Sequence, residues 1–189
     1  MDSQVFSATI KGISPLIMHN GALADPENEF CHELSKVSKG KAKDLAKAAK
    51  IEFLGGLYLD DNGEPCLPVD VIHAALIAGA RAHKLGKQAS AGVYDIPGFA
   101  TFKLEYVGPR DPEQLFEIES FRDRRGVRVQ QSRIIRTRPI FRNWSCTFKL
   151  EFDPTLITRE EIMTALIRAG KAIGLCDYRP RFGRFVVVS

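Results

Sequence analysis

The C-terminal part of the chain has a strand–helix–strand pattern that excludes most folds. Between Trp144 and Phe152 apolar residues alternate with polar ones, which is typical of a strand with one buried face. Thr158 and Glu161 have the spacing of a capping box, so a helix is expected from there to Gly174. The apolar run Phe185–Val188 predicts a last strand that is buried on both faces.

The first half of the chain has the same order of elements. Val5–Ile13 alternates like a strand, Val69–His83 has apolar residues on one helical face, and Phe99–Val107 alternates again. Leu57–Pro68 contains the turn sequence Asp-Asn-Gly and predicts a β-hairpin, while Leu115–Ser120 is expected to be extended. The two halves together predict an α+β fold, a ferredoxin-like split βαβ sheet of RRM-like topology with its helices on one face.

Residues 19–53 interrupt this pattern and predict a lysine-rich helical insertion in a single domain of residues 1–189. A turn-rich loop at 19–30 leads into a helical stretch at 29–53, which Gly40 is expected to break. A solvated lysine face explains this composition as well as a nucleic-acid contact does. The candidate contacts in the insertion are Lys39, Lys41 and Lys43.

Residues 121–142, which we call the arginine hairpin, hold the excess positive charge of the chain. Eight arginines and one aspartate give the segment a formal charge of +7, whereas the whole chain carries +4. A guanidinium grips phosphate with two hydrogen bonds and stacks on bases, so the stripe favours nucleic-acid binding over a charged edge strand that blocks pairing. Two extended arms are expected around Gln130–Arg133, with Gly126 as a bulge or tip. The candidate contacts are Arg122, Arg124, Arg125, Arg128, Arg133, Arg136, Arg138 and Arg142.

A second basic cluster lies close to the C-terminus, in the sequence DYRPRFGRF. Its aromatic residues stand among arginines in a polar loop, where they can stack on bases, whereas Trp144 is expected to pack in the core. The candidate contacts in this cluster are Arg179, Arg181, Arg184, Tyr178 and Phe182.

Cysteine usage and hydropathy exclude several classes of protein. The four cysteines are Cys31, Cys66, Cys146 and Cys176, and none forms a close pair, so we expect no metal, no cofactor and a reducing, cytoplasmic setting. No apolar run has the length of a membrane span, and the N-terminal sequence has no export pattern, so no membrane partner is expected.

Three segments match short patterns of one family. They are IKGISPLIMHNGAL at Ile10–Leu23, a turn-and-helix segment with a late arginine at Asp60–His83, and GLCDYRPRFGRFVVV at Gly174–Val188. In these segments the chain resembles the RAMP superfamily of CRISPR systems, especially the subunit that polymerises along guide RNA, or a phage or mobile-element relative of it.

The resemblance implies non-catalytic binding of RNA or single-stranded DNA by a subunit that self-associates or joins other effector subunits. It also implies that the arginine hairpin acts as a thumb and that residues 19–53 form a lid or web domain. Two alternatives stay open. Some RAMP proteins are metal-independent endoribonucleases, for which the candidates here are His19 and Asp25. A protein-interaction role, or imitation of an effector subunit, is the other.

Overall fold

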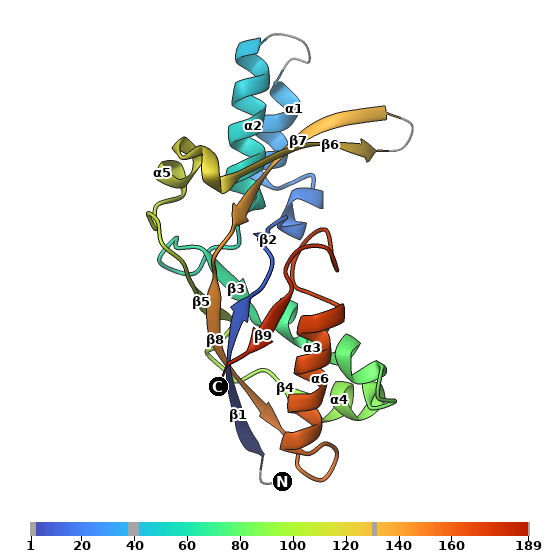
Figure 1. Ribbon diagram of the computed structural model, residues 1–189. Coiled ribbons are helices and arrows are strands. Elements are labelled where there is room, and N and C mark those ends of the chain that lie inside the picture. The colour runs from blue at the N-terminus through green and yellow to red at the C-terminus, as the bar shows by residue number, and fades with distance from the viewer. Residues whose placement is uncertain (1–2, 38–41, 130–131, 189) are drawn as a thin grey trace. The chain divides into compact units, whose positions relative to one another are not determined.

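The computed structural model describes residues 3–37, 42–129 and 132–188 (Figure 1). Two compact units make up the chain, and each is assembled from segments that are distant in sequence. The first unit comprises Met1–Leu16, Cys66–Val107 and Arg142–Ser189, and the second comprises Ile17–Pro65 and Gly108–Phe141. Residues 19–53 and the arginine hairpin up to Phe141 therefore belong to the same unit, although the sequence presented them as separate additions to one domain.

The first unit has an antiparallel sheet of the split βαβ kind. Its four main strands stand in the order β5-β8-β1-β9, and every neighbouring pair is antiparallel. Along the chain the elements alternate as strand, helix, strand, strand, helix, strand, which confirms the predicted α+β class and the ferredoxin-like order. These elements are β1 (Gln4–Gly12), α3 (Val69–Arg81), β5 (Thr101–Glu105), β8 (Ser145–Phe152), α6 (Arg159–Ala172) and β9 (Phe185–Val187).

Three short elements extend this unit. Strand β3 (Cys66–Pro68) pairs with β5 at one end of the sheet, and β4 (Val93–Tyr94) pairs with β8. Helix α4 (Gly86–Gly92) follows α3.

The predicted hairpin at Leu57–Pro68 keeps its turn, because Asp60 Oδ1 accepts hydrogen bonds from the N–H groups of Asn62 and Glu64. Its arms meet in a single bridge between Leu59 and Pro65, because Cys66–Pro68 pairs with β5 instead.

The core of the first unit lies where α3 and α6 cover one face of the sheet. Phe6 of β1 stands opposite Leu150 of β8, both are fully buried, and the alternation predicted for these strands is confirmed. Figure 1 shows α3 and α6 side by side, and their buried residues follow the predicted helical stripes. The capping box of Thr158 and Glu161 is formed at the start of α6.

The second unit is built around a small sheet of order β2-β7-β6 and a pair of helices. Strands β6 and β7 pair from Arg122–Pro139 to Val129–Ser132, which confirms the predicted hairpin. The helical stretch expected at 29–53 forms α1 and α2, and the predicted break at Gly40 lies outside the described residues. The elements are β2 (Leu16–Ile17), η1 (Gly21–Ala24), α1 (Glu29–Lys36), α2 (Ala42–Gly56), α5 (Pro112–Glu117), η2 (Glu119–Phe121), β6 (Arg122–Val129) and β7 (Ser132–Phe141).

Three local predictions are wrong. Leu115–Ser120 is helical, in α5 and η2, because the Asp111 side chain caps α5 and Pro112 occupies its first turn. Gly126 is neither a bulge nor a tip, since it pairs with Ile135 within the ladder. The last strand is not buried on both faces, because Phe185 packs against Gly170 of α6 whereas Val186, which projects to the opposite side, is 43% exposed.

Within the part of the chain that the structure describes, no helix is both long enough and apolar enough to cross a membrane.

Gly79 sets the close approach of α3 and α6, and its replacement by alanine should destabilise the first unit. A Cβ atom there would stand 2.1 Å from the carbonyl oxygen of Ala165. Although alanine favours helix by about 1 kcal/mol over glycine, we expect overpacking to dominate and the free energy of unfolding to fall by about 1–3 kcal/mol. Chemical unfolding followed by circular dichroism measures this change.

Gly21→Ala is the matched control, because it adds the same methyl group where nothing lies within 4 Å. Equal stabilities for Gly79→Ala and Gly21→Ala would show that the two helices do not pack at this distance.

Candidate nucleic-acid interface

The register of β6 and β7 divides the arginine hairpin into two faces. Side chains alternate along a strand, and residues directly opposite each other in an antiparallel pair share a face. Arg122 and Arg124 stand opposite Pro139 and Thr137 on what we call the outer face, where Pro139 and Thr137 are themselves buried. Asp123, Arg125, Arg136 and Arg138 alternate with them on the inner face.

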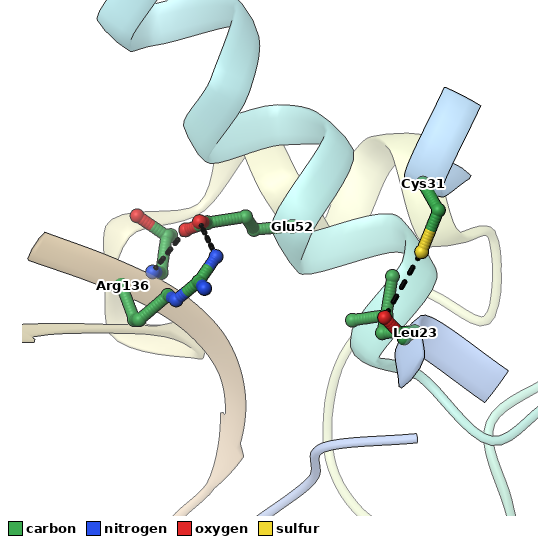
Figure 2. A network of polar contacts seen from close by, with 5 residues as sticks. Leu23, Cys31, Glu52 and Arg136 are labelled. Atoms are coloured by element: carbon green, nitrogen blue, oxygen red, sulfur yellow. Dashed lines mark hydrogen bonds and ion pairs between the residues drawn. The ribbon is translucent and has the colours of Figure 1, made fainter. Parts of the chain in front are cut away.

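Two arginines of the inner face pair with carboxylates of their own unit. Arg125 donates to the carboxylate of Asp123, two residues earlier on the same strand. Arg136 donates to Glu52 Oε1 from α2, and Glu52 Oε2 accepts a hydrogen bond of 2.9 Å from the backbone N–H of Thr137 (Figure 2). A mostly buried carboxylate thus fixes both a side chain and the backbone of β7.

The third inner arginine is buried. Arg138 stands opposite Asp123 in the register, and both residues are less than a tenth exposed. Of the three predicted contacts on this face, Arg138 is buried, whereas Arg125 and Arg136 are about a third exposed and form ion pairs with Asp123 and Glu52. A stripe that is continuous in sequence becomes two faces because successive strand residues project to opposite sides.

The outer face keeps exposed or half-exposed guanidinium groups. Arg124 is exposed, and the guanidinium of Arg122 lies 5.1 Å from the ring centroid of Phe116 on α5. Lys50 of α2 is 5.9 Å from the same ring and forms an ion pair with Glu113, which raises the pKa of Lys50. Arg128 and Arg133 pair with each other in the register, at positions of the same parity as Arg122 and Arg124.

The C-terminal arginine cluster belongs to the first unit, as does the exposed Arg142. Its loop is closed by backbone contact, because Leu175 N–H donates to the carbonyl of Gly183, where an added Cβ would stand 2.0 Å from Leu175 O. The rings of Tyr178 and Phe182 pack edge to face with centroids 6.2 Å apart. The arginines of this cluster are all exposed: Arg179, Arg181 and Arg184.

Of the three lysine candidates, one lies within the residues that the structure describes. Lys39 and Lys41 lie outside the described residues, and the backbone of Lys43 belongs to the first turn of α2.

The two candidate catalytic residues have separate local settings. His19 is exposed, its carbonyl accepts a hydrogen bond from the Tyr58 hydroxyl, and it lines a cavity of about 80 Å³ together with Glu52 and Arg136. Asp25 is exposed, and its side-chain Oδ1 accepts a hydrogen bond from the backbone N–H of Glu27, which forms a local Asx turn.

The cysteines behave as buried or half-buried apolar residues. Burial raises the pKa of the Cys146 thiol to about 12, and burial likewise raises that of Cys176 to about 12, so both stay protonated near neutral pH. Cys31 Sγ donates to the carbonyl of Leu23 at 2.9 Å (Figure 2).

The sequence did not single out Glu52, Phe116 or Lys50, which shape the interface. Glu52 is one acid in a lysine-rich helix, and nothing local marks it as the partner of residue 136, 84 positions away. For Phe116 a signal was present, because Asp111 and Pro112 mark the start of a helix that sets its position.

Glu52→Ala should loosen β7, because it removes the acceptor of both Arg136 and the Thr137 N–H. We expect a loss of about 1–3 kcal/mol in the free energy of unfolding and faster hydrogen exchange at the Thr137 amide. Glu52→Gln is the matched control, since its amide oxygen still accepts from Thr137. Slow exchange at this amide in Glu52→Ala would contradict the assigned role.

No protein-family model matches the chain, and no curated protein sequence matches it. Among solved structures, the chain is similar to the crystal structure of Cmr6 from Pyrococcus furiosus, with a TM-score of 0.43 and 9% sequence identity over 100% of both chains.

Proposed function

We propose that this chain binds single-stranded nucleic acid, RNA or DNA, through the phosphate backbone, and that the outer face of the arginine hairpin makes the contact. The observation that supports the proposal is the division of the hairpin. The inner arginines are paired or buried, whereas the outer face presents Arg122 and Arg124, and the register gives Arg128 and Arg133 the same parity.

The spacing of the arginines and the side chains beside them favour a single-stranded nucleic acid over an acidic protein as the partner. The Cα atoms of residues at alternate strand positions lie roughly 6.6 Å apart, so arginines placed there can follow a flexible, evenly charged chain. Aromatic and aliphatic side chains beside the arginines suit stacking with exposed bases, which a duplex keeps paired. Binding of this kind releases counterions, and its affinity falls with salt.

The same proposal includes assembly along the strand, as a self-associating or effector subunit in a CRISPR or phage nucleoprotein complex. Sedimentation of the protein with single strands of increasing length tests it, because several copies should bind a long strand. If one copy binds strands of every length, assembly along the strand is contradicted, whereas binding itself is not.

Arg124→Ala should weaken binding to single strands without changing the fold. The loss of one phosphate contact should lower affinity several-fold and reduce the slope of log affinity against log salt by about 1. Fluorescence anisotropy with labelled single-stranded RNA and DNA, measured across a salt series, gives both quantities.

Arg168→Ala is the control of equal charge, because Arg168 is exposed on α6 in the first unit. If Arg168→Ala changes affinity and slope as much as Arg124→Ala does, net charge rather than the hairpin governs binding. If the unaltered protein binds no polynucleotide at low salt, the proposal fails and a protein-interaction role takes its place.

A metal-independent endoribonuclease is the second candidate, and the small cavity that His19 lines together with Glu52 and Arg136 favours it. A histidine at a cavity that also contains a cation can move a proton while the cation stabilises the developing charge of a bound substrate. Gel analysis of the same RNA decides: shortened products that form in the presence of chelator and vanish with His19→Ala support cleavage, and intact RNA excludes it.

A further inference from the structure

The second unit contains a groove of about 520 Å³ beside the outer face of the arginine hairpin. Its walls come from α2, from the α5–η2 segment and from β6 and β7, which are all parts of this unit. The volume lies within the roughly 300–1,000 Å³ that is typical of small-molecule sites. Neither the sequence motifs nor the proposed phosphate contact accounts for this groove.

One side of the groove is apolar. Leu45, Ala46 and Ala49 of α2 line it, and the half-buried ring of Phe116 faces the same space. Leu45 is 52% exposed although the helix has buried positions for apolar residues on other turns. The two alanines leave a flat surface, because neither carries a side chain beyond Cβ.

The other side of the groove is charged. Arg122 and Arg124 of the outer face line it, and Glu119 of η2 supplies a carboxylate. Arg122 lies over the ring of Phe116, so a guanidinium and an aromatic ring meet at the boundary between the two sides. An anion is attracted to the two arginines and kept away from Glu119.

We propose that the groove binds one nucleotide of the bound strand, with its base on the surface of Leu45, Ala49 and Phe116 and its phosphate at Arg122 and Arg124. This inference rests on the proposed function. A phosphate alone would leave the apolar side wet, and an apolar ligand alone would leave the guanidinium groups without an anion. A nucleotide combines a flat ring and a phosphate within the length of the groove.

The experiment compares two strands of equal length and charge. One is a single-stranded oligoadenylate, and the other has the same backbone with abasic units in place of the bases. Ala49→Trp fills the groove, and Leu45→Gln makes its floor polar at a largely exposed position. Ala74→Trp, at an exposed position of α3 in the first unit, controls for the added indole. Circular dichroism verifies that each variant folds.

The unaltered protein should bind the oligoadenylate more tightly than the abasic strand. Ala49→Trp and Leu45→Gln should each lower affinity for the oligoadenylate, on the order of tenfold for the filled groove, and leave affinity for the abasic strand unchanged. Ala74→Trp should change neither affinity.

Two results would overturn the inference while backbone binding stands. One is equal affinity of the unaltered protein for both strands. The other is an equal loss for both strands in Ala49→Trp, which would show that the groove only supports the backbone contact. Failure of the unaltered protein to bind either strand at low salt would instead remove the proposed function, and this inference with it.

Discussion

One carboxylate decides how the arginine hairpin is presented. Glu52 of α2 binds the Arg136 side chain with one oxygen and the Thr137 backbone N–H with the other. A charge this deeply placed has to be paired, because leaving it unpaired after desolvation costs several kcal/mol. The pair therefore fixes the parity of β7. Since side chains alternate, Arg124, which stands opposite Thr137, projects from the other face of the hairpin than Arg136, and Arg124 is exposed.

This parity divides the arginines between two tasks. The inner ones contact the acids of the unit or are buried, so they contribute to its stability and lose much of their reach toward a ligand. The outer ones, Arg122 and Arg124, line an apolar groove, and the proposed binding rests on this arrangement. The number of arginines in the sequence is therefore larger than the number that can contact a ligand at once. The sequence also does not show that the remaining ones lie on one face of the hairpin.

The first unit is a close-packed scaffold with a separate set of cations. Its helices approach through Gly79, and its C-terminal loop closes on Gly183, where an added Cβ would stand within 2.1 Å of a carbonyl oxygen in each case. Cys176 and Tyr178 have positive φ in that loop, a conformation that costs free energy for residues other than glycine. The loop therefore keeps the exposed Arg179, Arg181 and Arg184 on a defined backbone rather than on a freely moving tail.

The sequence by itself determined the regular elements, because strand alternation, helical stripes and caps are local properties. The strand ending at Phe152, the capping box at Thr158 and the hairpin of β6 and β7 could all be predicted from neighbouring residues. Only the tertiary structure decided which arginines face outward, that Phe185–Val187 lies at a sheet edge, and that α2 and Phe116 form a groove. Each of these depends on a contact between residues far apart in the chain, such as Glu52 with Arg136. Such partners cannot be predicted from local sequence patterns.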